Sequence, residues 1–149
     1  MTETAQKWAQ ASVDVMYSND HMAQSMEIKI TEIAPGYAKA TMTVRKDMLN
    51  GHAITHGGAT FALADTAFAY ACNTYNKVTV ASGCDITYSA PSHEGDILTA
   101  VAKETILMGR SGIYDITITK QDGTIVALFR GRSRTISGQL IPDTEETKK

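Results

Sequence analysis

Polar and apolar residues alternate strictly in one stretch near the start of the chain. Residues 27–33 (Glu-Ile-Lys-Ile-Thr-Glu-Ile) have the two-residue period of a β-strand with one face in water. Ala34-Pro35-Gly36 is typical of a turn, and residues 37–44 form the predicted returning strand of a hairpin. Upstream, residues 4–17 space their apolar side chains three or four apart, which predicts a short N-terminal helix. Asn19-Asp20 ends that pattern and can cap a further short turn.

The longest helix-like segment is nearly free of charge. It spans residues 59–72, opens on Gly57-Gly58 after a polar loop at residues 45–56, and contains six alanines. A helix that is apolar almost all round is buried on most sides, and small side chains let neighbouring backbones come close. We therefore expect this helix at the centre of the fold.

Strand patterns return after this helix and continue almost to the end of the chain. Four strands are predicted, at residues 77–88, 96–107, 113–120 and 124–136, with breaks at Ala90-Pro91, Met108-Gly109 and Gln121-Asp122-Gly123. Helices and strands are segregated, so the fold class is α+β. An antiparallel sheet must curve around the central helix, and because one sheet covers only one side, a second copy is the natural partner for the other.

The length of 149 residues suits one domain, with its core at about residues 27–138. The charged residues 143–149 are expected to be a disordered tail.

Composition narrows the function classes. Fourteen Lys and Arg against sixteen Asp and Glu give a net charge of −2, which argues against a nucleic-acid partner. The longest purely apolar run, residues 67–72, is far too short to cross a membrane. The first twenty residues carry charges and no continuous apolar stretch, so no secretory signal is expected. Two cysteines, Cys72 and Cys84, have no metal or redox spacing, and we expect a cytoplasmic protein.

Asp65 is the most unusual residue of the central helix. It lies among alanines in the middle of the helix, where Asp has poor propensity and no cap to form. A carboxylate there is paired, protonated or functional, or it reaches the helix rim and finds water or a hydroxyl. The residues alone leave these possibilities open.

The loop before the helix holds further candidates. The free N–H groups at His56-Gly57-Gly58 suit an oxyanion or a phosphate, although two glycines can also serve only the turn. Asn50-Gly51 suits a routine turn, and the Asn50 amide could also hold a water or a carbonyl. His52 and His56 are four residues apart, but they lie on a loop without a third ligand, so neither a metal nor a cofactor is expected.

The spacing of Gly58 and Asp65 along the helix favours an active site shared between two copies of the chain. Asp65 follows Gly58 by seven residues, which is about 10 Å along the helix axis. A reacting atom should lie about 3 Å from both the base and the oxyanion donors. One chain does not easily satisfy both, whereas a two-fold dimer with antiparallel helices can set Asp65 of one copy opposite Gly58 of the other.

Several hydroxyls and cations stay ambiguous. Thr66 can bond an upstream carbonyl or face a ligand, and Ser82 is on a strand whose faces the pattern does not distinguish. Arg130, Arg132 and Arg134 share one strand face, which is solvated or forms a clamp for phosphates. Lys103 and Arg110 have the same two interpretations.

These motifs resemble a known family. Asn50-Gly51-His52, His56-Gly57-Gly58 and the segment at residues 63–73 around Asp65 closely resemble the acyl-CoA thioesterases of the hotdog fold, in the branch that acts in phenylacetate degradation. The resemblance spans residues 8–138. It implies a curved antiparallel sheet around one long helix, and two protomers with active sites at their interface, commonly assembled as a homotetramer.

The resemblance also implies roles for individual residues. Asp65 matches the essential carboxylate, a general base or a nucleophile, and Gly58 or Gly57 matches the amide that polarises the thioester carbonyl. Asn50 matches a polar residue near the thioester, and His56 matches a loop histidine that orients this group. Ser82 is the nearest candidate for a strand hydroxyl, and the remaining predicted substrate contacts are the side chains of Phe61, Thr66, Phe68 and Arg110.

The implied reaction is hydrolysis of an aryl-acetyl-CoA, such as phenylacetyl-CoA or hydroxyphenylacetyl-CoA. Medium-chain acyl groups remain open. A hotdog hydratase or dehydratase that uses His56 with Asp65 is one alternative, and a non-catalytic acyl-CoA sensor is another. The sensor is less favoured because only about 25 residues precede the first strand, with no basic recognition helix.

Overall fold

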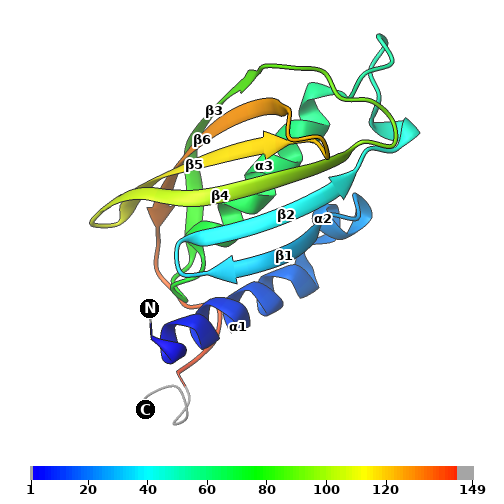
Figure 1. Ribbon diagram of the computed structural model, residues 1–149. Helices are drawn as coiled ribbons and strands as arrows, with labels where there is room; N and C mark the ends of the chain where they lie inside the picture. Colours follow the sequence, from blue (N-terminus) through cyan, green and yellow to red (C-terminus); the bar gives the residue numbers. More distant parts are fainter. Residues whose placement is uncertain (1, 144–149) are drawn as a thin grey trace.

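The computed structural model describes residues 2–143, and its main element is one six-stranded antiparallel sheet. The strand order is β1-β2-β4-β5-β6-β3. Figure 1 shows the sheet in front of α3, with α1 running beside β1. The strands are β1 (Lys29–Ala34), β2 (Tyr37–Thr43), β3 (Thr79–Tyr88), β4 (Ile97–Met108), β5 (Ser111–Thr119) and β6 (Ile125–Thr135).

The helices begin where polar side chains can cap them. In α1 (Glu3–Asn19) the Thr2 hydroxyl accepts a hydrogen bond from the Ala5 amide. In α2 (His21–Ser25) the Asp20 carboxylate does the same for the Ala23 amide, as expected for the turn after Asn19-Asp20. The third helix, α3 (Gly57–Cys72), is the long central one. A short 3₁₀ turn, η1 (Lys46–Met48), lies in the loop before it.

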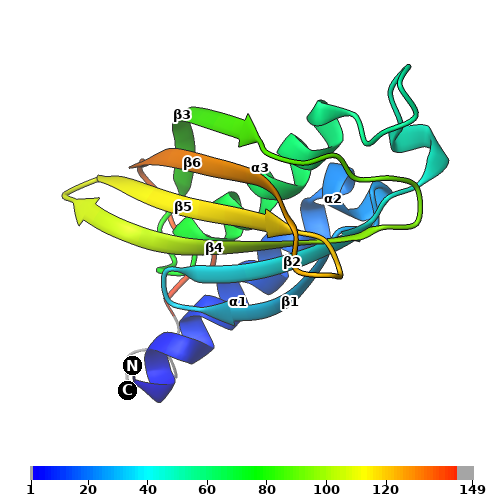
Figure 2. The ribbon, with the colours of Figure 1, turned by 45° about the horizontal axis from the view of Figure 1, so that its top comes forward.

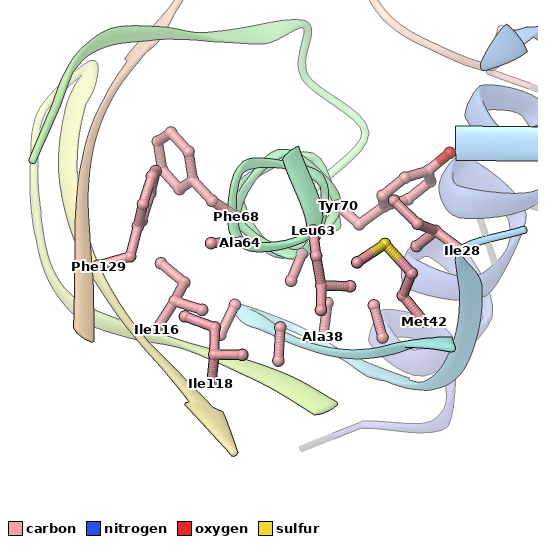
Figure 3. Close-up of a cluster of buried hydrophobic side chains, with 14 of the residues drawn as sticks. Ile28, Ala38, Met42, Leu63, Ala64, Phe68, Tyr70, Ile116, Ile118 and Phe129 are labelled. Carbon is pink, nitrogen blue, oxygen red and sulfur yellow. The ribbon is translucent and has the colours of Figure 1, made fainter. Parts of the chain in front are cut away.

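The sheet bends around α3, so the core lies between the helix and the concave face. Figure 3 looks along α3 and shows Ile116, Ile118 and Phe129 on one side and Met42 and Ile28 on the other. Burial alternates along β2 and β5, which is the period of a strand with one buried face. Where the helix lies closest, small side chains fill the core: Ala38, Ala40, Ala64, Ala67, Ala100 and Ala102, each 0% exposed.

Gly131 of β6 lies directly against the ring of Phe68 from α3. A Cβ atom on Gly131 would lie 2.6–2.7 Å from three atoms of the Phe68 ring. The same ring contacts Tyr114 and Phe129, with ring centroids 5.7 and 6.0 Å away. Glycine in β6 thus makes room for an aromatic side chain from the helix.

The connection after α3 carries the chain to the far edge of the sheet. Figure 2 shows β3 and β1 at opposite edges. Asn73 fixes the end of the helix, since its amide donates to the Ala69 and Thr79 carbonyls and accepts from the Thr79 amide. β3 then pairs only with β6, and most of its residues are exposed. One edge of β3 is left unpaired by the described part of this chain, and Ala62, Asp65 and Ala69 on one side of α3 are only partly buried.

The predicted elements are confirmed, with boundaries within two residues. Local irregularities were not predicted, among them the 3₁₀ turn η1 and a bulge in β3 where Ala81 pairs with Ser133 but Gly83 pairs with Arg132. Of the predicted tail, residues 144–149 lie outside the described part of the chain. Among the described helices, none is long and apolar enough to cross a membrane.

We predict that Gly131→Ala destabilises the protein by about 1–3 kcal/mol, because the added methyl group overpacks the Phe68 ring. Chemical denaturation measures the change. Gly51→Ala is the control, since a Cβ there meets no atom within 4 Å. Equal stability of both variants would contradict the close packing of α3 on β6.

Candidate active site

A cavity of about 510 Å³ opens at the N-terminal end of α3. The loop before the helix forms one wall and the segment after β3 forms another. Its floor includes a buried hydroxyl pair, in which Thr55 Oγ1 and Ser92 Oγ lie 2.5 Å apart. The lining residues are Asn50, Ile54, Thr55, Gly57, Thr60, Tyr88, Ser89, Ala90, Pro91, Ser92 and Val126.

His56 caps α3 with its side chain. The Gly58 amide donates to His56 Nδ1 at 2.9 Å, while the His56 amide donates to the Met48 carbonyl at 2.7 Å. The Gly58 N–H, predicted as an oxyanion donor, is thus already bonded within the chain. For the Gly57 N–H we find no acceptor among the described residues, and Gly57 lines the cavity.

Tyr88 lies over the start of α3 and was not predicted as a site residue. Its hydroxyl donates to the Gly57 carbonyl at 2.7 Å, and its ring is so close that a Cβ on Gly57 would lie 3.0 Å away. Tyr88 thereby holds the first peptide of the helix from across the cavity. Its position at the end of a strand, next to Ala90-Pro91, is the only signal in the sequence that points to it.

Asn50 folds its loop around its own side chain. Its Oδ1 accepts from the His52 amide at 2.9 Å and more weakly from the Ile54 amide at 3.4 Å, and its backbone N–H donates to the Ile54 carbonyl at 2.9 Å. The predicted turn at Asn50-Gly51 is therefore present. The Asn50 Nδ2 donors have no acceptor among the described residues and are available to a molecule in the cavity.

Asp65 is partly buried and has neither a hydrogen-bond donor nor an ion-pair partner among residues 2–143. It does not line the cavity at the helix N-terminus. Burial raises the pKa of the Asp65 carboxyl, and the negative charge of Asp20 raises it further. A carboxylate without a partner, with a raised pKa, has the properties that a general base needs.

Asp20 connects the N-terminal helices to α3. One of its carboxylate oxygens caps α2, and the other accepts a hydrogen bond from the Tyr70 hydroxyl at 3.1 Å. The Tyr70 ring packs near Tyr17, with ring centroids 6.4 Å apart. The carboxylate that influences Asp65 is therefore held in place by two hydrogen bonds.

The other predicted contacts are scattered. The Thr66 hydroxyl donates to the Ala62 carbonyl at 2.7 Å, which is the local alternative considered from the sequence. Ser82 is exposed in the β3 bulge, and its hydroxyl donates to the Arg132 carbonyl. Phe61 is half-buried against Phe129, with ring centroids 5.2 Å apart.

None of these predicted side chains lines the cavity at the helix N-terminus, and the same holds for Phe68 and Arg110. Phe68 is only 1% exposed and packs against Tyr114 and Phe129 in the core. The sequence could not show that Phe68 lies deeper than Phe61. Arg110 is exposed in the turn between β4 and β5, beside a different cavity. Among the described residues, no cluster of three or more His, Cys, Asp or Glu side chains could hold a metal ion.

Comparisons with known proteins identify the family. The sequence profile of the thioesterase superfamily matches residues 52–127, which include the capped helix, Asp65 and the cavity walls from Tyr88 to Val126. The chain is also 48% identical over 125 residues to the acyl-coenzyme A thioesterase PaaI of Escherichia coli, covering 84% of this chain and 89% of that protein. This chain belongs to the thioesterase superfamily.

Solved structures agree with this assignment. The structure of the E. coli PaaI protein from the phenylacetic acid degradation operon matches with a TM-score of 0.88 and 46% identity, covering 90% of this chain and 97% of that one. A mutant of the phenylacetic acid degradation protein PaaI from Thermus thermophilus matches with a TM-score of 0.76 and 36% identity, covering 78% and 100%. The predicted hotdog fold is confirmed, and the chain is a thioester hydrolase instead of a hydratase or a sensor.

We predict that Asp65→Asn raises the stability of this thioesterase at neutral pH. An acid whose pKa is raised on folding destabilises the folded state once the pH exceeds its ordinary pKa, because the folded protein holds the proton more tightly. The gain should vanish in acid, where the carboxyl is protonated in both states.

Thermal unfolding of both proteins across that pH range measures the effect. Asp14→Asn, at an exposed position of α1, is the control and should change stability by no more than about 0.5 kcal/mol. A loss of stability in Asp65→Asn at neutral pH would mean that Asp65 has a favourable partner.

Proposed function

We propose that this thioesterase hydrolyses aryl-acetyl-CoA esters, of the phenylacetyl or hydroxyphenylacetyl type, to the free acid and CoA. The observation that carries the proposal is the pair of free donors at the helix N-terminus, the Gly57 amide and Asn50 Nδ2, in a chain whose helix also holds Asp65, a carboxylate without a partner among the described residues. The 48% identity to an acyl-coenzyme A thioesterase supports the substrate class.

The thioester carbonyl binds at the N-terminus of α3. Attack on this carbonyl places negative charge on its oxygen, which the Gly57 N–H and the positive end of the helix dipole stabilise. We assign this role to Gly57 over Gly58, because the Gly58 amide is bonded to His56. His56 then acts as a positioning residue that caps the helix, and Asn50 Nδ2 offers a second donor.

Asp65 of a second copy completes the site. Asp65 activates the attacking water or attacks the thioester carbon itself, and a raised pKa makes its carboxylate a stronger base. Because Asp65 and Gly57 are eight residues apart on one helix, about 12 Å along its axis, one chain does not bring them together. Two helices packed antiparallel about a two-fold axis do.

The uncovered edge of β3 supports this pairing. The strand has one free edge and exposed apolar side chains at Val80 and Tyr88, at 44% and 52% exposed, and Asp65 on the adjoining side of α3 is only partly buried. Pairing of two β3 strands would join the sheets and bring the helices together. A further assembly of two such dimers into a tetramer stays a prediction.

The acyl group occupies the apolar part of the cavity. Ile54, Ala90, Pro91 and Val126 form walls beside the donors, and a volume of about 510 Å³ accepts an aromatic ring. The two structural relatives named for phenylacetic acid degradation support an aryl-acetyl group.

The direct test is thiol release from phenylacetyl-CoA, 3-hydroxyphenylacetyl-CoA and octanoyl-CoA. We expect the aryl-acetyl esters to be hydrolysed fastest, and Asp65→Asn to lower kcat by about 10²–10⁴, the range of a lost general base. Asp14→Asn is the matched control with the same charge change. Faster hydrolysis of octanoyl-CoA would contradict the aryl-acetyl substrate and favour a medium-chain acyl group. Full activity of Asp65→Asn would refute the role of Asp65.

A mixing experiment tests the shared site. Asp65→Asn and Gly57→Ala homodimers should both be nearly inactive, the latter because the added Cβ meets Tyr88 at 3.0 Å. After the two variants exchange subunits, about half of the dimers are mixed, and each contains one intact site. Activity should therefore recover to about a quarter of the wild type. No recovery after proven exchange would mean that each site lies within one chain.

A further inference from the structure

Five described side chains with a hydroxyl group line the cavity at the N-terminal end of α3: Thr55, Thr60, Tyr88, Ser89 and Ser92. Four of these hydroxyls are hydrogen-bonded within the chain. The hydroxyls of Thr55 and Ser92 bond each other, and those of Tyr88 and Ser89 donate to backbone carbonyls at 2.7 and 2.8 Å. The Thr60 hydroxyl differs from the other four, because it has no hydrogen-bond partner among residues 2–143.

The structure gives a local reason for the free hydroxyl of Thr60. In a helix, a threonine hydroxyl commonly donates to the carbonyl three or four residues earlier. The carbonyl four residues earlier is that of His56, which already accepts from the Ala59 and Thr60 amides at 2.9 and 3.3 Å. The carbonyl three residues earlier is that of Gly57, which accepts from the Tyr88 hydroxyl at 2.7 Å. Both usual acceptors are therefore engaged by other donors.

The Thr60 hydroxyl faces the cavity. The residue is 5% exposed. Every fully enclosed side-chain oxygen or nitrogen in the described chain has a partner, so the small exposed area of Thr60 includes its Oγ1 atom. Because Thr60 lines the cavity, this oxygen opens into it. A nearly buried hydroxyl without a partner is costly unless a ligand or water bonds it.

Thr60 lies close to the free amide at the start of the helix. It follows Gly57 by three residues, so the two share one side of α3 and are about 4.5 Å apart along its axis. A helical side chain leans toward the N-terminus of its helix, which carries the Thr60 hydroxyl back toward the Gly57 amide. The cavity thus offers a third donor beside the Gly57 amide and Asn50 Nδ2.

We propose that the Thr60 hydroxyl donates a hydrogen bond to the thioester carbonyl oxygen and is a further catalytic residue. The proposal rests on the proposed function, in which this carbonyl binds at the N-terminus of α3. When the thioester carbon is attacked, an electron pair of the C=O bond moves to the oxygen, and a hydroxyl donor bonds the anionic oxygen more strongly than the neutral one. The pair returns as the C–S bond breaks, and the Thr60 proton stays on its own oxygen throughout.

Two inert analogues of phenylacetyl-CoA test the contact without turnover. In the ketone analogue a methylene group replaces the sulfur and the carbonyl is kept, whereas in S-(2-phenylethyl)-CoA a methylene group replaces the carbonyl. In calorimetric titration we expect the wild type to bind the ketone more tightly. Thr60→Val, which keeps the shape of the side chain, should weaken ketone binding by about 3–10-fold, the loss of one neutral hydrogen bond, and leave thioether binding unchanged. Thr60→Ser keeps the hydroxyl and should retain the affinity for the ketone.

Thiol release from phenylacetyl-CoA supplies the kinetic test. Thr60→Val should lower kcat by about 10²-fold, as expected for the loss of one oxyanion donor, and raise KM by no more than the factor found for the ketone. Thr43→Val, at an exposed position of β2, is the control and should change neither constant. Chemical denaturation should show no loss of stability in Thr60→Val, since the hydroxyl has no partner to lose in the free protein.

The possible outcomes separate this contact from the proposed reaction. If no acyl-CoA is hydrolysed but Thr60→Val loses affinity for the ketone alone, the reaction is refuted and the contact stands. If the wild type hydrolyses phenylacetyl-CoA and Thr60→Val keeps full kcat and full ketone affinity, the contact is refuted and the reaction stands. A wild type that binds neither analogue, or a Thr60→Val protein that is less stable and binds both analogues equally weakly, also overturns the role of Thr60.

Discussion

Close packing between α3 and the concave face of the sheet is the constraint on which the other features depend. The helix can lie this deep only because alanines face it from β2 and β4 and Gly131 yields to the Phe68 ring. Dispersion attraction and the burial of apolar surface both stabilise this contact, and both contributions are lost if the helix moves outward. The depth of the helix also determines where its two ends emerge, and each end borders a cavity.

The N-terminal end of α3 shows how a helix terminus can be kept both ordered and available. His56 satisfies one amide and the Tyr88 hydroxyl satisfies the first carbonyl, while the Gly57 amide has no acceptor among the described residues. A terminus capped at every amide would be stable and inert, and one capped at none would fray. For the chemistry of this terminus, it matters more which of the two glycine amides is already hydrogen-bonded than that two glycines are present.

Local patterns predicted much of this structure. The alternation in β1, the alanine-rich helix and the turn signals gave element boundaries within two residues, because strand and helix periods are properties of short segments. Asp65 stood out for the same reason, as a charge in an apolar helix. The Asn50 and His56 motifs were recognisable, although the choice between the Gly57 and Gly58 amides was not, since it depends on which way the His56 ring turns.

Contacts between residues far apart in the chain could not be predicted from the sequence. Nothing local indicates that β3 crosses to the far edge to pair with β6, or that Tyr88 reaches Gly57 from 31 residues away. Phe61 and Phe68 look alike in the sequence, yet the sheet encloses only Phe68. The cations at Lys77, Arg110 and Arg134 are separated by more than 20 residues, so their proximity is evident only once the β4–β5 turn meets the end of α3.

The bond between Asp20 and Tyr70 has a consequence for how such an enzyme can diverge. Asp20 precedes the segment that matches the superfamily profile, yet its charge acts on Asp65 inside that segment. Substitutions in the N-terminal helices can therefore adjust the acidity of the helix carboxylate while α3 itself and the loop before it stay unchanged. Natural selection could adapt a descendant to a more acidic or more alkaline setting through a region outside the segment that matches the superfamily profile.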